Sequence, residues 1–357
     1  MPAAVYSGDN CIKNNASVFT SMGKRAFLIC ASSSKKNGAL DDVASLLDKR
    51  NIAHKENFDA IPNPTLENVW GITSEAKAFS PDFIVTVGGG SVMDAAKAVA
   101  VLCANPQYKV EDLYLPDFEK DALPLIAVPT TCGTGSEVSG VSVLTVGDNK
   151  KSFGHKSIYP KAAFLDGRYL LTLPERILLD TFVDALAHAT EGYLMNDHPV
   201  ADMMSMEVFR RIKKIKPYLK REVYSKEMLD ELLYIAMIAG VALSINGTAA
   251  VHAMGYPLTV HKGYSHGRAC GVLLGGYIDM VKDVREDKVR EMMDALGLFD
   301  VSSFCAWIEN LLEPNAQFSS AEIDRFTDIS ALPASKKNNP IPFGKKEVIE
   351  LYNRSLF

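Results

Sequence analysis

The sequence predicts two domains of different classes: an α/β domain over residues 1–173, followed by an all-helical domain over residues 174–357. Two observations indicate this division. In the first half, short apolar runs typical of buried strands alternate with amphipathic stretches of helical period. Beyond Leu173-Pro174-Glu175, long segments of helical period follow one another. The length of 357 residues is sufficient for two domains with substantial cores.

The expected elements of the first half are short runs bounded by polar or glycine-rich turns. The strands are expected at Lys24–Ala31, Ala53–Asp59, Asp82–Val87, Pro124–Val128, Val141–Val146 and Ala162–Asp166. Helices are expected from about Leu40 to Lys49, from Asn63-Pro64-Thr65 onwards and over Val92–Cys103, with a polar connection at Gly147–Lys151. The second half is expected to hold helices over Arg176–Met195, Val200–Leu219 and Lys226–Ser244, near Gly271–Met280, and shorter ones up to Phe357.

Composition narrows the class of protein. An apolar content of 47%, a charged content of 23% and a net charge of -5 are ordinary for a globular protein, and they argue against a nucleic-acid partner. We see no apolar run of membrane-spanning length and no basic-then-apolar leader over Met1–Ser21, so we expect a cytoplasmic protein with no membrane partner. The six cysteines are scattered without a Cys-x-x-Cys and are interpreted as reduced thiols.

Two loops of the first half are candidates for binding a dinucleotide. In the first, a buried strand runs into Gly88-Gly89-Gly90-Ser91 and then into an Ala-rich helix. Glycines let the backbone approach a phosphate closely, and the start of a helix favours negative charge. The second loop, Pro129–Glu137, offers hydroxyl and backbone donors that suit a ribose and a pyrophosphate. A triple glycine alone can also be a tight turn, and the second loop can be a plain polar connection.

Two stretches of the second half predict a metal site. Asp184 and His188 lie one turn apart on an expected helix, so both side chains can meet one ion. His252 closes an apolar stretch, and Gly255, Pro257 and Gly263 are expected to break any long helix before His266 and let the chain fold back. One carboxylate and three imidazoles suit Fe(II), Zn(II) or a similar ion. The alternative for each piece is a surface pair or a satisfied core histidine.

With these residues assembled, the sequence resembles the iron-containing (group III) alcohol dehydrogenases, a family that includes lactaldehyde/propanediol and butanol dehydrogenases. The resemblance spans nearly the whole chain. The motifs that carry it are Asn63-Pro-Thr, Gly88-Gly-Gly-Ser-Val-Met-Asp94-Ala-Ala-Lys97, Pro129-Thr-Thr-Cys-Gly-Thr-Gly-Ser-Glu-Val138, Asp184-Ala-Leu-Ala-His-Ala-Thr-Glu-Gly-Tyr193, His252 with His266-Gly267, and Asn339-Pro340.

The resemblance implies a Rossmann-like N-terminal domain, an all-helical C-terminal domain and an active site in the cleft between them, an architecture shared with dehydroquinate synthase. It implies that the metal ligands, which act in catalysis through the metal, are Asp184, His188, His252 and His266. The residues it implies for the cofactor are Asn63, Gly89, Gly90, Ser91, Asp94, Thr130, Thr131 and Thr134, with Lys150 or Lys151.

The function implied is a metal-dependent, NAD(P)H-linked alcohol dehydrogenase or aldehyde reductase. Its metal is Fe2+ or Zn2+, its substrate a small alcohol or aldehyde, and its assembly a homodimer or higher homo-oligomer. A metal-bound substrate oxygen is polarised while hydride passes between the substrate carbon and the nicotinamide. The alternatives are a dehydroquinate synthase-like or glycerol dehydrogenase-like metalloenzyme, and a non-enzymatic cofactor-binding protein. The sequence does not name the aldehyde or alcohol.

The chain departs from the family pattern near its late histidines. Many relatives have a further histidine one turn after the first of this pair, and here that place is Tyr256. His261 is a candidate for the same proton-relay role, with a solvated loop histidine as its alternative. The stretch Lys150–Tyr159 is shortened, which leaves the choice between Lys150 and Lys151 open.

The coenzyme preference is predicted from the end of the first long strand. NAD-selective enzymes commonly place a carboxylate there, which accepts hydrogen bonds from the ribose and repels a 2′-phosphate. This chain has Ala31 at that place, followed by Ser32-Ser33-Ser34-Lys35-Lys36 close to a helix start. Hydroxyl donors and cations favour a phosphate, with Ser32, Ser33 and Lys36 as the expected contacts. We therefore expect NADP(H) to be favoured over NAD(H), the alternative being a solvated polar turn.

Overall fold

A six-stranded parallel sheet forms the centre of the first half of this computed structural model, which describes residues 2–220, 223–312, 317–330 and 338–356. The strand order is β1-β8-β5-β4-β2-β3. The strands are β1 (Ala4–Ser7), β2 (Arg25–Cys30), β3 (Ala53–Asn57), β4 (Phe83–Gly88), β5 (Leu125–Pro129) and β8 (Ala162–Leu165). Every neighbouring pair is parallel, so the carboxyl ends of β2, β4 and β5 meet at one edge of the sheet.

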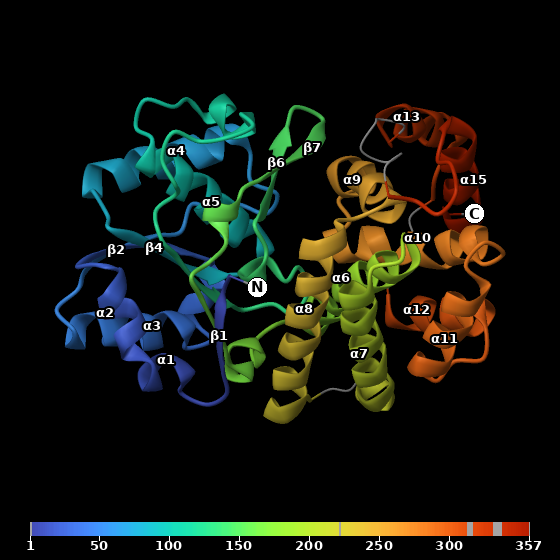
Figure 1. Cartoon of the computed structure of the whole chain (residues 1–357), viewed down its shortest axis with the longest axis horizontal. Helices are drawn as coiled ribbons and strands as arrows, with labels where there is room; N and C mark the ends of the chain where they lie inside the picture. The colour runs from blue at the N-terminus through green and yellow to red at the C-terminus, as the bar shows by residue number, and fades with distance from the viewer. Residues whose placement is uncertain (1, 221–222, 313–316, 331–337, 357) are drawn as a thin grey trace. The chain divides into compact units, whose positions relative to one another are not determined.

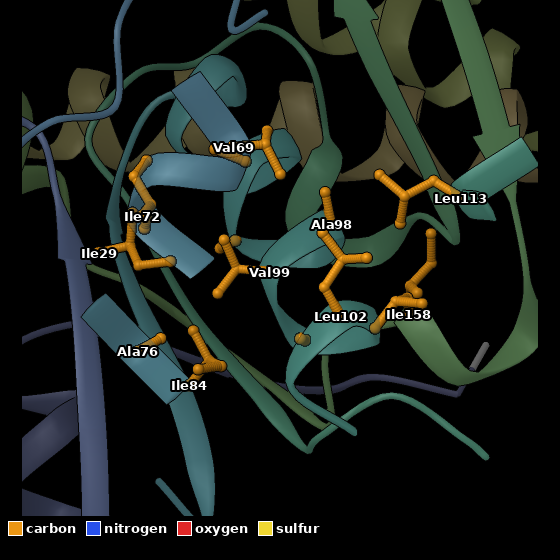
Figure 2. Close-up of a cluster of buried hydrophobic side chains, with 14 of the residues drawn as sticks. Ile29, Val69, Ile72, Ala76, Ile84, Ala98, Val99, Leu102, Leu113 and Ile158 are labelled. Carbon is orange, nitrogen blue, oxygen red and sulfur yellow. The ribbon is translucent and has the colours of Figure 1, made fainter. Parts of the chain in front are cut away.

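Helices cover both faces of this sheet. They are α1 (Cys11–Asn14), α2 (Ala16–Met22), α3 (Ala39–Lys49), α4 (Leu66–Phe79) and α5 (Gly90–Ala104). α4 and α5 lie on one face and α1 to α3 on the other (Figure 1). Figure 2 shows the core under α4 and α5, where Ile29 and Ile84 of the sheet meet Val69 and Ile72 of α4 and Val99 of α5. Because β4 is buried along its whole length, its sequence is apolar except for Thr86.

An antiparallel hairpin, β6 (Val141–Val146) with β7 (Asn149–Gly154), follows β5. The expected polar connection at Gly147–Lys151 is therefore wrong in part: only the turn at 147–148, in which Gly147 has φ +58°, is a connection, and the polar residues from Asn149 onwards form a strand. β7 is mostly exposed, so it lacks the apolar alternation by which strands are recognised. The short 3₁₀ helices of this half are η1 (Ser32–Lys35), η2 (Val110–Tyr114), η3 (Ser136–Val138), η4 (Lys156–Ile158) and η5 (Gly167–Leu170).

The rest of the chain is helical. Its described helices are α6 (Glu175–Leu194), α7 (Pro199–Ile215), η6 (Lys216–Tyr218), α8 (Lys226–Asn246), α9 (Ala250–Lys262), α10 (His266–Val281), α11 (Glu286–Leu296), α12 (Val301–Leu311), α13 (Ser320–Ser330) and α15 (Lys345–Leu356). A parallel α/β part followed by a helical part confirms the predicted fold class.

The chain separates into two compact units. The first consists of Met1–Leu173 with Tyr224–Met237, and the second of Pro174–Val223 with Ile238–Phe357. The early part of α8 thus belongs to the first unit.

α8 is the one described helix that is long and apolar enough to span a membrane. It has 21 residues and a mean hydropathy of 1.8 over its most apolar window, 44% of which is buried. The expectation that no apolar run reaches membrane-spanning length is therefore wrong by length and composition. A core helix meets the same criterion.

Candidate metal centre and dinucleotide site

Helix α6 supplies three buried polar side chains from one face. Asp184, His188 and Glu191 follow one another at helical intervals, and each is at most 4% exposed. The residues around them in the helix are also buried and largely apolar. Burying charged or polar groups is costly unless they find partners, so this face needs partners from other elements.

α9 provides the first of these partners, His252, from its opening turn. The expected break at Gly255 and Pro257 is wrong, because α9 runs through both residues and ends at Gly263, whose φ of +68° stops the helix. Pro257 lies inside this helix, so the carbonyl of Ala253 receives no hydrogen bond from residue 257. His252 and Tyr256 consequently share one face of a regular helix.

His266, the first residue of α10, is brought close by two glycines on the same helix. A Cβ atom on Gly267 would lie 1.8 Å from the carbonyl oxygen of Asp180, and one on Gly271 would lie 2.4 Å from Val183 Cγ1. Only glycine permits this approach of α10 to α6. Ser265, the N-cap of α10, also donates a hydrogen bond of 2.6 Å from Oγ to Asp180 Oδ2. These contacts fix the start of α10 against the middle of α6.

The three elements place three potential ligand atoms around one point. His252 Nε2 lies 3.7 Å and His266 Nε2 3.8 Å from Asp184 Oδ1. These distances are too long for hydrogen bonds but close to the roughly 3.4 Å between neighbouring donors on a tetrahedral ion with bonds of about 2.1 Å. Asp184 Oδ1 and His252 Nε2 are buried and have no hydrogen-bond partner among the described residues. The donor set thus fits a divalent transition metal.

The surrounding imidazoles keep Asp184 ionised. Burial alone would raise the pKa of this carboxyl, but His188 and His266, followed by His252, lower it below its usual range. The side chain of His266 is 26% exposed, whereas those of Asp184 and His252 are only 2% exposed. His266 is therefore the most exposed of these three side chains.

Two further groups belong to this cluster that the sequence did not single out. Glu191 accepts a hydrogen bond of 2.6 Å from Val251 N through Oε1 and bonds His252 Nδ1 through Oε2. Cys270 lies one turn after His266, and its sulfur and the ligand atoms of Asp184, His252 and His266 all lie within 4.8 Å of one another. Helical spacing was the available signal, because Glu191 is two turns after Asp184 and Cys270 is one turn after His266.

His188 and His261 each stack on another aromatic ring. The ring of His188 stacks on His252 with centroids 4.4 Å apart, and His188 is not in the tight set of ligand atoms found among the described residues. His261 stacks on Phe326 of α13 at 5.9 Å. Tyr256, by contrast, stacks on His266 at 5.8 Å. The group next to the donors is therefore the phenol at position 256.

In the first unit, the glycine turn and the threonine loop pack directly on each other. A Cβ atom on Gly89 would lie 3.0 Å from Thr131 Cγ2, and one on Gly90 would lie 2.4 Å from Thr134 Cγ2. α5 begins at Gly90, so the open start of a 15-residue helix faces this loop. Such a helix start is suited to a phosphate.

Backbone hydrogen bonds bring the other predicted cofactor residues to the same edge. Thr130 N donates to Gly88 O at 3.1 Å, and Ala31 N donates to Val87 O at 2.8 Å. Asn63, in the left-handed region at φ +53°, donates from its backbone N to Ser91 Oγ at 3.1 Å. The ends of β2, β4 and β5 and the residue Asn63 thus form one continuous polar edge.

The buried side chain of Lys97 makes hydrogen bonds next to this edge. Lys97 is 1% exposed and donates from Nζ to Ser136 Oγ at 2.7 Å, Ser139 Oγ at 3.2 Å and Val141 O at 2.7 Å. Burial lowers the pKa of Lys97 to about 8, although Asp94 and Glu137 oppose the shift. Lys97 therefore ties α5 to the segment that follows the threonine loop.

Burial raises the pKa values of the two acids of this cluster, Asp94 and Glu137. Burial raises the pKa of Asp94 to about 6, against the influence of Lys97, and that of Glu137 to about 7. Asp94 Oδ1 lies 3.4 Å from Ser136 Oγ, the donor of that bond. Asp94 thus contacts the loop that carries the predicted cofactor threonines.

The lysines and serines predicted for the cofactor differ in their surroundings. Lys151 Nζ lies 4.0 Å over the ring of Tyr114, while the charge of Lys150 acts on Asp94. After β2, the side chains of Ser32, Ser33 and Lys36 are exposed. Ser34, between them, is buried and donates from Oγ to Ala31 O at 2.6 Å.

The fold and these two clusters give an α/β unit whose polar edge is suited to a phosphate and a helical unit whose donor set is suited to a divalent ion. Two family models match nearly the whole chain: iron-containing alcohol dehydrogenase over residues 2–167, and the C-terminal Fe-containing alcohol dehydrogenase family over residues 178–356.

Individual relatives agree with this match. Long-chain-alcohol dehydrogenase 1 of Geobacillus thermodenitrificans is 31% identical over 278 residues, which cover 77% of this chain and 70% of that protein. The alignments with the next three curated relatives cover 54% to 60% of their length. The solved iron-containing alcohol dehydrogenase of Thermotoga maritima is 34% identical, with a TM-score of 0.92 over 100% of this chain and 98% of that one.

A solved sulfoacetaldehyde reductase from Bifidobacterium kashiwanohense, in complex with NAD+, is 26% identical, with a TM-score of 0.88 over 99% of this chain and 97% of that one. The chain belongs to the iron-containing alcohol dehydrogenase family, as its motifs predicted. It is an oxidoreductase that acts on CH–OH groups, with a metal ion, a nicotinamide dinucleotide and a small alcohol or aldehyde as its ligands.

Proposed function

We propose that Asp184, His188, His252 and His266 bind one divalent transition metal, Fe2+ or Zn2+. The observation that carries this proposal is the position of Asp184 Oδ1, 3.7 Å and 3.8 Å from two imidazole nitrogens. His188 enters the set from the same face of α6, one turn from Asp184. A bound ion supplies a Lewis acid that polarises the substrate oxygen. Glu191 orients the ring of His252 through the contact of its Oε2 with Nδ1.

The reaction proposed is hydride transfer between a nicotinamide dinucleotide and a small primary alcohol or aldehyde. The residues that hold the dinucleotide are Asn63, Gly89, Gly90, Ser91, Asp94, Thr130, Thr131, Thr134 and Lys150. Lys150 is preferred to Lys151 because the latter's ammonium group lies over Tyr114. In this assignment the protein supplies position and charge for the dinucleotide, and no protein nucleophile is required.

NADP(H) is the coenzyme proposed, with Ser32, Ser33 and Lys36 around its 2′-phosphate. Three observations support this choice. These side chains are exposed, they follow β2 at the same edge as the glycine turn, and the stretch from Ala31 to Lys36 contains no acid. A cation and two hydroxyl groups can bind a phosphate, whereas NAD-selective sites commonly hold a carboxylate at this place.

The proposal also covers the location of the enzyme, its assembly and the border between its domains. The proposed location is the cytoplasm and the proposed assembly a homodimer or higher homo-oligomer. The boundary after residue 173 is the proposed border between a dinucleotide-binding and a metal-binding domain. A dehydroquinate synthase-like or glycerol dehydrogenase-like activity is not favoured, since both family models are those of alcohol dehydrogenases.

The test combines metal analysis with activity. The purified protein should contain one divalent ion per chain and oxidise NADPH with at least one member of a panel of short alkyl and hydroxyalkyl aldehydes. His266→Ala should lose most of both the metal and the activity, whereas His155→Ala, which removes a histidine of the other unit, should keep them. Full metal content and full turnover in His266→Ala would show that the site is misassigned.

A further inference from the structure

We propose that Cys270 is an additional metal-facing donor, so that its sulfur binds the ion together with Asp184, His252 and His266. The inference rests on the metal site of the proposed function and adds a residue to it. With Cys270, one soft sulfur joins the nitrogen and oxygen donors of the proposed site.

Position is the first argument. Cys270 lies on α10 one turn after His266, so both side chains point from the same face of that helix. Its sulfur and the ligand atoms of Asp184, His252 and His266 are all within 4.8 Å of one another. In zinc sites the metal–sulfur bond is about 2.3 Å and the metal–nitrogen bond about 2.0–2.1 Å, so four donors around one ion need mutual distances below this limit.

Two orphaned atoms give an independent indication that something binds between these side chains. Asp184 Oδ1 and His252 Nε2 are buried, and neither has a hydrogen-bond partner among the residues the structure describes. A buried acceptor or donor without a partner costs on the order of 1–3 kcal/mol. An ion among the four donors would remove that cost for both atoms.

The packing around the sulfur keeps it in place. Cys270 is fully buried, and a Cβ atom on Gly255 of α9 would lie 3.4 Å from its Sγ. The thiol is thus enclosed by the helices that carry His252 and His266.

The donor set predicts a change in metal preference. Thiolate is a soft ligand that favours zinc and other soft ions, while carboxylate and imidazole are harder. With Cys270 in the set, the protein should prefer zinc to iron more strongly than a set of one carboxylate and three imidazoles does. Removing the sulfur should shift this preference back towards iron.

Cobalt substitution tests the proposal directly. Bonding of cobalt(II) to a thiolate gives an intense charge-transfer absorption in the near ultraviolet, which nitrogen and oxygen ligands do not give. The cobalt-loaded wild-type protein should show this absorption, Cys270→Ser should lose it, and the matched variant Cys305→Ser on α12 should keep it. In competition with a chelator, Cys270→Ser should bind zinc about tenfold more weakly or worse, with a smaller loss for iron.

The outcomes separate this proposal from the proposed function. If the folded wild-type protein binds one cobalt ion but lacks the sulfur absorption, Cys270 is not a ligand, whether or not its variant folds. An absorption that persists in Cys270→Ser would equally overturn the assignment. If the wild-type protein binds no cobalt, zinc or iron at all, the metal site itself is wrong and this inference fails with it.

Discussion

The carboxylate of Glu191, on α6, makes two contacts with α9. Its Oε1 accepts a hydrogen bond of 2.6 Å from the backbone N of Val251, and its Oε2 is bonded to Nδ1 of the His252 ring. A carboxylate can only accept, so Nδ1 of His252 carries the proton and Nε2 presents its lone pair. That lone pair faces Asp184 Oδ1. One acid outside the proposed ligand set therefore fixes the orientation and the tautomer of a proposed ligand.

Glu191→Gln should weaken metal binding while preserving the fold. The amide oxygen can still accept from Val251, but the amide NH₂ then meets the N–H of His252, which must change tautomer or rotate. The loss of this support should reduce metal affinity roughly 10–100-fold. Competition with a chelator, followed by metal analysis, measures it.

The matched control is Glu291→Gln, because Glu291 also contacts α6, through a 2.6 Å bond from Tyr193, but lies outside the metal cluster. Its metal affinity should equal that of the wild type. Equal affinity in Glu191→Gln would show that His252 is oriented by other contacts.

Gly267→Ala should separate α10 from α6. The added Cβ atom would lie 1.8 Å from the carbonyl oxygen of Asp180, which is backbone and cannot rotate away. The strain should exceed the ~1–3 kcal/mol typical of overpacked cores. Because His266 is the preceding residue, the variant should lose metal as well as stability, measured by the metal content and the denaturation midpoint.

Gly192→Ala is the control for this change. Gly192 also lies in a buried helix of the same unit, but a Cβ atom added there would find its nearest neighbours at 3.7 Å and 3.9 Å, an ordinary contact. Alanine should be neutral there or stabilise the helix by up to ~1 kcal/mol. A Gly267→Ala variant as stable and as metal-rich as Gly192→Ala would contradict the close helix approach.

Glu137 should make the stability of the protein depend on pH. Burial raises its pKa from 4.5 to about 7, so between these values the folded state binds more protons than the unfolded state. The contribution of this group to stability is therefore present below pH 4.5 and falls as the pH rises to about 7. In Glu137→Gln, the free energy of unfolding should fall less between pH 5 and 7 than in the wild type, as measured by urea denaturation.

Glu67 provides a control of opposite sign. This exposed residue in the first turn of α4 has a pKa lowered mainly by its own backbone N–H and by Thr65. Its contribution is lost as the pH falls, so Glu67→Gln should leave the slope between pH 5 and 7 unchanged. A slope that is identical in the wild type and Glu137→Gln would mean that Glu137 is not buried with a raised pKa.

The sequence could predict elements whose pattern is strong and local. The buried strand β4 and the helix α5 were recognised because an apolar run, three glycines and an alanine-rich stretch occur in succession. β7 and β1 were missed, since a short exposed edge strand has no apolar alternation. Pro257 and Gly255 misled the prediction of α9, because tertiary packing can hold a helix together across residues that break isolated helices.

The candidate metal centre shows the same limit. Asp184 and His188 were found from spacing within one helix, and His252 and His266 from the glycine-rich stretch later in the chain. The resemblance then implied all four as the ligand set. Glu191 and Cys270 have the same helical spacing from these residues, but a buried Glu or Cys on a helix has many structural explanations. The approach of α10 to α6, which depends on Gly267, brings Cys270 to the other donors, whereas Glu191 meets them through its contacts with α9. Such contacts between distant segments are absent from any local pattern.

Lys36→Glu should reverse the coenzyme preference. Lys36 is exposed at the end of η1, beside Ser32 and Ser33, at the edge of the sheet where β2 and β4 end. In the wild type, kcat/KM with NADPH should exceed that with NADH more than tenfold, since a charged hydrogen bond to the 2′-phosphate contributes at least ~1.5 kcal/mol. The new carboxylate repels that phosphate and can accept from a ribose hydroxyl, so the efficiency with NADPH should fall at least tenfold while that with NADH holds or rises.

Lys35→Glu serves as the control because the ammonium group of Lys35 lies 3.7 Å over the ring of Phe58, so the change there should affect both coenzymes to a similar, smaller degree. Equal efficiency of the wild type with NADPH and NADH, or a wild-type preference for NADH, would rule out a 2′-phosphate site at Ser32–Lys36.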